Sequence, residues 1–217
     1  MDCVRIEAGQ PLEAAVAAGG TVCLGAGVHA GPLVLTKSVV LRGDAGAVID
    51  AGGRDSVLRI EGDDLVIRVE AVTLRGGVAE AGGGLALTGW SEVVVVGCTL
   101  ESNQARGRAG SSGGGGGAYA SRGTLRFEGS TFRDNRAPIG SDLFVTGASE
   151  VTLTGGHLAG DIAGREGTKL ALAGVAVAGA LDVRGTTTRA PTVVVQGGSL
   201  GSVRNDPSLP ASVEILP

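Results

Sequence analysis

Gly97-Cys98-Thr99-Leu100-Glu101-Ser102-Asn103 is followed, 32 residues further on, by Gly129-Ser130-Thr131-Phe132-Arg133-Asp134-Asn135. Both heptads read Gly-x-Thr-(Leu or Phe)-x-x-Asn, and a third copy, Gly155-Gly156-His157-Leu158-Ala159-Gly160-Asp161, has Asp in place of the final Asn. With the apolar residue as the marker, weaker copies extend the series to positions 74, 100, 132, 158, 177 and 200. A repeat of roughly 20 to 50 residues is typical of a solenoid. The sequence therefore predicts stacked coils that share one strand position.

Each period contains three apolar pieces of strand length, as in residues 84–87, 93–96 and 99–100. These pieces are too short for helices, and their β-branched residues favour strands. Three strands per coil would build three parallel sheets, and connections between parallel strands are almost always right-handed. We therefore predict an all-β fold, a right-handed parallel β-helix.

The composition agrees with narrow coils, because the chain has 40 glycines but only five aromatic residues. Residues 11–18, Pro-Leu-Glu-Ala-Ala-Val-Ala-Ala, have one apolar face and predict a short helix that caps the first coil. We expect a single β-helix domain over 1–217. It would comprise an N-terminal cap at 1–20 that includes helix 11–18, coils at 21–205, and a C-terminal cap or tail at 206–217.

The net charge of −4 and the pI of about 5.2 argue against a nucleic-acid partner. No apolar run approaches the roughly 18 residues of a membrane-spanning helix, and the N-terminus lacks the pattern of a leader peptide. Sixteen of the 18 basic residues are arginine. This bias reflects either GC-rich coding or recognition of carboxylates on an acidic glycan.

Cys3 and Cys23 each lie in a short apolar segment, and side-by-side pairing of these segments would allow a disulfide. Such a bond closes a loop of about 20 residues and contributes roughly 3 kcal/mol. It would indicate an extracellular or cell-surface protein. Two buried free thiols are the alternative, and with them a cytoplasmic location. Cys98 has no evident partner and is expected in the core.

Asn103 and Asn135 occupy equivalent turns and predict a hydrogen-bonded ladder along the solenoid axis. The five aromatic residues all fall between 90 and 144. Trp90 and Tyr119 lie beside turns, where exposed rings would stack on sugars. The alternative is internal packing, with the phenylalanines along one core row.

Two stretches carry a resemblance to known families. Residues 11–50, with the helix at 11–18, the segment Gly25-Ala26-Gly27-Val28-His29-Ala30-Gly31-Pro32-Leu33 and the strand Val48-Ile49-Asp50, resemble the first coils of pectin-lyase-like β-helix proteins. The middle resembles the repeats of polymorphic outer-membrane proteins, since Phe132-Arg133-Asp134-Asn135 fits Phe-x-x-Asn and Gly116-Gly117-Ala118 fits the Gly-Gly-aliphatic partner. The resemblance implies the fold, but this fold hosts lyases, hydrolases, adhesins and spacers alike.

A polysaccharide lyase of this family implies acidic Ca²⁺ ligands near a basic residue. Asp63 and Asp64 with Arg68 form one such group, and Asp134 with Asp142 forms another. Solvated turns and surface ion pairs explain both groups equally well. The hydrolases of the family carry an Asp-Asp pair and a Gly-His-Gly segment, which neither His29 nor His157 matches.

We therefore predict a non-catalytic β-helix domain of an exported bacterial surface protein, acting in display, adhesion or carbohydrate contact. A polysaccharide lyase or glycoside hydrolase is the first alternative, and a self-assembling scaffold is the second. Polysaccharide or a surface protein is the expected partner of a monomeric chain. No metal site or cofactor is expected, with Ca²⁺ reserved for the lyase alternative. Residues 90–144 are the region in which we expect recognition.

Overall fold

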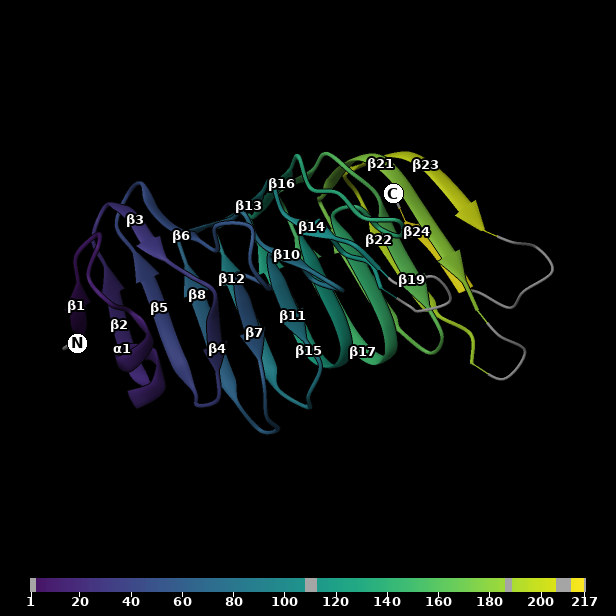
Figure 1. Ribbon diagram of the computed structural model, residues 1–217. Coiled ribbons are helices and arrows are strands. Elements are labelled where there is room, and N and C mark those ends of the chain that lie inside the picture. Colours follow the sequence, from purple (N-terminus) through teal and green to yellow (C-terminus); the bar gives the residue numbers. More distant parts are fainter. Residues whose placement is uncertain (1–2, 108–112, 186–188, 206–211, 217) are drawn as a thin grey trace.

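The computed structural model describes residues 3–107, 113–185, 189–205 and 212–216 (Figure 1). Short strands stack along one direction, from the N-terminal coils in purple to the C-terminal coils in yellow. Every strand pairing in the described residues is parallel, from β1 with β2 at one end to β22 with β24 at the other. The chain is a parallel β-helix.

Strand registers divide the coils into three sheets. Sheet A contains β1 (Val4–Ile6), β2 (Gly20–Leu24), β5 (Val39–Gly43), β8 (Val66–Glu70), β12 (Glu92–Val96), the ends of β15 (Ala118–Glu128) and β17 (Leu143–Thr154), β20 (Lys169–Ala173), β22 (Thr192–Gln196) and β24 (Ser212–Leu216). Sheet B contains β3 (Gly27–Ala30), β6 (Ala47–Asp50), β9 (Thr73–Arg75), β13 (Thr99–Glu101), β16 (Thr131–Arg133), β18 (His157–Leu158) and the starts of β21 (Ala176–Arg184) and β23 (Ser199–Asn205). Sheet C contains β4 (Leu33–Leu35), β7 (Leu58–Ile60), β11 (Leu85–Leu87), the starts of β15 and β17, β19 (Ile162–Arg165) and the ends of β21 and β23.

The repeat markers all lie in sheet B and in register. Leu74 pairs with Leu100, Leu100 with Phe132, and Phe132 with Leu158. The series continues through Val177 to Leu200. The sequence repeat thus corresponds to the strand register of sheet B. The spacing between markers varies because the turns differ in length.

Rows of small apolar side chains fill the interior, because alternate residues of each strand face inward. In sheet A one such row runs through Leu41, Val69, Val95, Phe127 and Leu153, each at most 2% exposed. Phe132 of sheet B meets Phe127 edge to face, with ring centroids 4.9 Å apart. The phenylalanines therefore do not form one row: they pack across the interior, and Phe144 lies on the other side of sheet C, in the row of Tyr119.

The turn from sheet A to sheet B has the same conformation in successive coils. Its first residue has a positive φ, which is +54° at Ala71 and +56° at both Gly97 and Gly129. Glycine adopts this left-handed region without a steric cost. This turn explains the glycine that opens each heptad of the repeat.

The single helix of the described residues, α1 (Glu13–Ala18), begins two residues later than predicted. Leu12 is its N-cap residue: its carbonyl accepts the Val16 N–H at 3.1 Å, and its side chain is buried together with that of Val16. The helix packs against β2 and β4. It therefore buries its apolar face on the first coil.

Two further elements are short or terminal. β10 (Val78–Ala79) pairs with β14 (Gln104–Ala105) in a separate two-stranded sheet between sheets B and C. β24 adds a strand to sheet A within the segment 206–217 that we predicted as a cap or tail; positions 206–211 and 217 of that segment lie outside the described residues. None of the helical structure described is long and apolar enough to cross a membrane.

Candidate functional site

Trp90 lies in the turn that leads from sheet C to sheet A, and its side chain is 51% exposed. Both of its backbone groups are held by the preceding coil. The Trp90 N–H donates to Oδ1 of Asp63 at 2.7 Å, and the Asp64 N–H donates to the Trp90 carbonyl at 2.8 Å. The ring thus projects from a backbone fixed by two hydrogen bonds.

The residues around Trp90 tighten the same turn. Ser91 is buried; its hydroxyl donates to the Gly62 carbonyl at 3.0 Å and accepts the Leu65 N–H at 3.1 Å. A methyl group added at Gly89 would come within 2.1 Å of that carbonyl oxygen. On the next coil, Arg122 donates from Nε to the Thr88 carbonyl at 2.9 Å. We call residues 61–65, 88–91 and 121–123 the Trp90 corner.

Tyr119 is the other predicted aromatic contact, and it lies in β15 of sheet C, paired in register with Phe144. The two rings are 5.6 Å apart between centroids. Burial raises the pKa of the Tyr119 hydroxyl. No ring contact joins Tyr119 to Trp90 in the described residues. The two rings are therefore placed separately, and only Trp90 has an exposed ring.

The acidic candidates are distributed over different turns. Asp63 and Asp64 belong to the Trp90 corner, and Asp64 has a φ of +59°. Asp134 has a φ of +56° and directly precedes the buried Asn135 in a turn from sheet B to sheet C. Asp142 is 1% exposed; its two oxygens accept the Asn135 side-chain N–H at 2.9 Å and the Gly160 N–H at 2.6 Å. Burial raises the pKa of Asp142.

Arg68 belongs to an ion-pair row on the outer face of sheet A rather than to the acidic turn. Arg68 and Arg42 both donate to Glu70, Arg42 at 2.6 Å. The hydrogen bonds from Arg42 and Arg68 hold the pKa of Glu70 below its usual value. Across the described residues, no three His, Cys, Asp or Glu side chains converge as a metal site would require.

The predicted structural residues hold neighbouring coils together. Asn103 donates to the Leu74 carbonyl at 3.0 Å and accepts the Gly77 N–H at 3.0 Å. In the next coil, Asn135 makes the equivalent two bonds: it donates to the Leu100 carbonyl at 2.9 Å and accepts the Asn103 N–H at 3.1 Å. Each amide thus spans from its own coil to the backbone of the neighbouring one.

The cysteines divide into one bonded pair and one free thiol. Cys3 and Cys23 form a disulfide between residues whose Cα atoms are 5.8 Å apart. Cys98 is a free, buried thiol, and burial raises its pKa to about 11. The histidines are also separated, since His29 is fully buried and His157 is exposed on sheet B.

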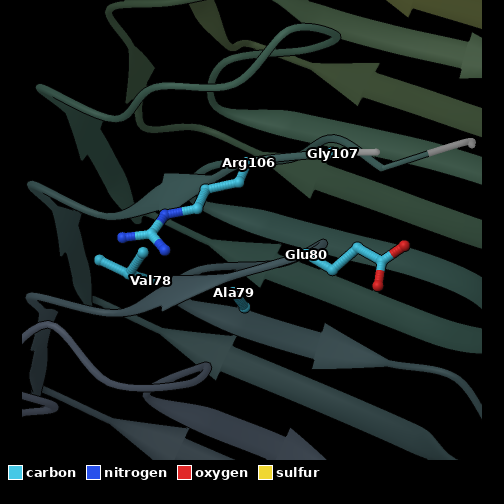
Figure 2. A pocket seen from close by; sticks show the side chains of 5 residues that line it. All are labelled: Val78, Ala79, Glu80, Arg106 and Gly107. Atoms are coloured by element: carbon cyan, nitrogen blue, oxygen red, sulfur yellow. The ribbon is translucent and has the colours of Figure 1, made fainter. Parts of the chain in front are cut away.

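A second surface feature arises where three successive turns from sheet B to sheet C extend outward. We call it the flange; it consists of 78–80, 104–107 and 136–138, joined by the β10–β14 pairing and by a parallel bridge from Gln104 to Arg136. One hollow of about 400 Å³ lies over Val78, Ala79, Glu80, Arg106 and Gly107 (Figure 2). A second, of about 370 Å³, is lined by Gln104, Ala105, Arg106, Arg136, Ala137 and Pro138.

Arg106 borders both hollows. Figure 2 shows its guanidinium extending toward Val78, whereas the Glu80 carboxylate points the opposite way. Gly107, the last residue of the flange on this coil, lies next to Gly113, where the structure of the longest turn is described again. A methyl group added at Gly113 would lie 2.5 Å from the Gly107 Cα. Positions 108–112 between them, part of the long turn expected at 104–117, lie outside the described residues.

Comparison with protein-family models, curated proteins and solved structures gives no match to this chain. The resemblance to pectin-lyase-like proteins is thus supported at the level of the parallel β-helix alone.

Sequence reasoning placed Trp90 beside a turn but missed Arg106 and Gln104. Strands of two residues, such as β14, have too few positions to show a period. The hydrogen bond between Asp63 and Trp90 was equally hidden, because it joins adjacent coils 27 residues apart. Only the three-dimensional register brings such residues together.

Proposed function

We propose that this chain is a non-catalytic β-helix domain of an exported bacterial surface protein, and that it contacts carbohydrate through the Trp90 corner. The exposed, backbone-anchored ring of Trp90 is the observation that carries the proposal. A large aromatic face held in place binds a sugar ring at little cost in conformational entropy. Asp63 and Arg122 lie beside it, where polar groups fix the orientation of hydroxyls.

The disulfide supports the exported location. Disulfides persist in oxidising compartments and are rare in the cytosol. The bond between Cys3 and Cys23 joins β1 and β2, the first two strands of sheet A. It therefore stabilises the end of the solenoid at which the coils begin.

The local roles of the acidic residues support a non-catalytic function. Asp63 accepts a backbone N–H, and Asp142 is buried with both oxygens occupied. A glycosidase needs two carboxyl groups facing the same substrate. Asp134 belongs to a turn between different sheets from the turn of Asp63 and Asp64. Asp63 and Asp142 thus each have a local structural task.

A polysaccharide array tests the proposal, and Trp90 allows a direct readout because it is the chain's only tryptophan. We expect a bound saccharide to change the Trp90 fluorescence. We expect Trp90→Ala to lose binding and Trp90→Phe to retain most of it, because phenylalanine keeps a stacking face. Val66→Ala is the control, since it removes apolar surface from a side chain that is 56% exposed on sheet A. Binding of neutral polysaccharides that is unchanged in Trp90→Ala, or an array with no such binding at all, would overturn the proposal.

A further inference from the structure

Eleven of the fifteen described arginines of this acidic chain have a hydrogen-bond or ion-pair partner. Nine of them form ion pairs with Asp or Glu side chains: Arg5, Arg42, Arg59, Arg68, Arg75, Arg126, Arg133, Arg165 and Arg184. Arg54 and Arg122 donate to backbone carbonyls instead. These bonds give the arginine side chains a structural task within the solenoid.

The other four are Arg106, Arg136, Arg189 and Arg204. Of these, Arg106 and Arg136 are both exposed and border the same hollow. Within the described part of the chain, neither guanidinium has an ion-pair or hydrogen-bond partner. Their backbones, in contrast, are fixed. The Arg106 N–H donates to the Ala79 carbonyl at 2.9 Å, and the Arg136 N–H donates to the Asn103 carbonyl at 2.9 Å. Rigid strands therefore present two free cationic groups to solvent.

The two arginines lie on successive coils, since Arg136 pairs in register with Gln104 in the same strand segment as Arg106. Successive coils are about 4.8 Å apart. Ala105 and Ala137 line the same hollow, and their side chains are too small to fill it. A chain that runs along the solenoid axis would pass both guanidinium groups in turn.

We propose that the flange binds an acidic polysaccharide whose oxyanions, carboxylate or sulfate, contact Arg106 and Arg136. Each planar guanidinium donates two parallel hydrogen bonds to one such group. The amide of Gln104, which is paired with Arg136, supplies a neutral donor and acceptor for sugar hydroxyls. The site is separate from the Trp90 corner and uses no metal.

The choice of a saccharide over an acidic peptide rests on the proposed function and on the edge of the flange. A peptide would add most readily as a further strand beside 136–138. Arg136 already directs its N–H and its carbonyl toward residues 103–105, and Pro138 interrupts regular strand pairing, so that edge would support only a short ladder. Contact through side chains suits a polysaccharide, which needs no backbone ladder.

Three dextrans test the proposal because they share one backbone: neutral dextran, carboxymethyl-dextran and dextran sulfate. We expect the charged forms to bind, with affinity falling as salt is raised, and neutral dextran not to bind at this site. Arg106→Gln and Arg136→Gln should each weaken binding by about tenfold. Arg189→Gln, which removes the same charge from an exposed arginine elsewhere, should leave the affinity unchanged. Trp90→Ala should not affect it either, which separates this site from the proposed Trp90 contact.

Poly-glutamate and free sulfate ion complete the experiment. Tighter binding of poly-glutamate than of either charged dextran would overturn the saccharide assignment. Free sulfate that binds as tightly, at the same concentration of charged groups, would overturn the proposal that a polysaccharide chain runs along the solenoid axis. The flange would then be a site for single anions. A double Arg106→Gln, Arg136→Gln variant that binds as tightly as the unmodified protein, with unchanged thermal unfolding, would overturn the site itself.

Discussion

The side chain of Asn135 accepts the backbone N–H of Asn103, at 3.1 Å from Oδ1. Its Nδ2 donates to the Leu100 carbonyl at 2.9 Å and to Oδ1 of Asp142, also at 2.9 Å. One buried amide thereby satisfies groups on its own coil and on the neighbouring one. Buried polar groups that lose such partners destabilise a fold strongly.

Replacement of Asn135 by Ala should therefore lower the free energy of unfolding by about 3 kcal/mol, because three buried groups lose a partner. Urea unfolding followed by circular dichroism measures the change. Thr131→Ala, on the outer face of the same coil, serves as the control and should cost less than about 0.5 kcal/mol. A loss at Asn135 no larger than that of the control would contradict the role of the ladder.

Ala71 and Gly97 occupy equivalent turns with φ of +54° and +56°, and their exchange should have opposite effects. Ala71→Gly removes the steric cost of a left-handed residue but also raises the entropy of the unfolded chain. The net effect should be a rise of about 0.5 kcal/mol in the free energy of unfolding. Gly97→Ala should lower it by about 1 kcal/mol. A Cβ at Gly97 meets no atom within 4 Å, so the effect there is conformational. Changes of the same sign at both positions would refute this explanation.

Thiol titration should distinguish the three cysteines. The folded protein should show little reaction, since Cys98 is buried and its thiol has a pKa raised to about 11. Unfolding without reductant should expose one thiol, and unfolding with reductant should expose all three. Reduction should also lower the free energy of unfolding by about 3 kcal/mol. Three reactive thiols before reduction would show that Cys3 and Cys23 are not bonded.

Glu70 should contribute to stability at neutral pH and not in acid. Its pKa is lowered in the folded protein by the hydrogen bonds from Arg42 and Arg68, from an ordinary value of 4.5. Its contribution is therefore present above the unfolded pKa and is lost as the pH falls through the folded pKa. Glu70→Gln should lower the free energy of unfolding by about 1 kcal/mol at neutral pH and leave it unchanged at about pH 2.

Glu128 provides the matched control for that experiment. It lies in the same outer row of sheet A, two coils further on. It has no ion-pair partner among the residues described. Glu128→Gln should therefore show no such loss at neutral pH, and an equal loss in both variants would point to net charge rather than to the arginine contacts.

The parts of the fold that repeat were predictable, whereas contacts between turns of unequal length were not. The marker residues from Leu74 to Leu200 share one sheet because a repeat in sequence becomes a register in a solenoid. The glycine of each heptad was visible for the same reason. In contrast, the helix begins at Glu13, two residues later than the position favoured by Pro11.

The candidate site was less predictable, because its members come from turns whose lengths vary. Trp90 was identified by residue type, but its anchor on Asp63 depends on the alignment of two turns. Tyr119 was expected beside a turn, with internal packing as the alternative. It packs on Phe144, since both residues face the same side of sheet C. Arg106 became distinctive only when the hollow that it shares with Arg136 was known.

The close approach of Gly107 and Gly113 has a consequence for how this chain can change. The longest turn departs from the flange and rejoins it at nearly one point, so its length is independent of the spacing between coils. The entropy of closing such a turn grows only slowly with the number of residues. Insertions or replacements between these glycines would therefore change the surface beside Arg106 while every coil keeps its register. This position should tolerate variation in length and sequence better than the coils do.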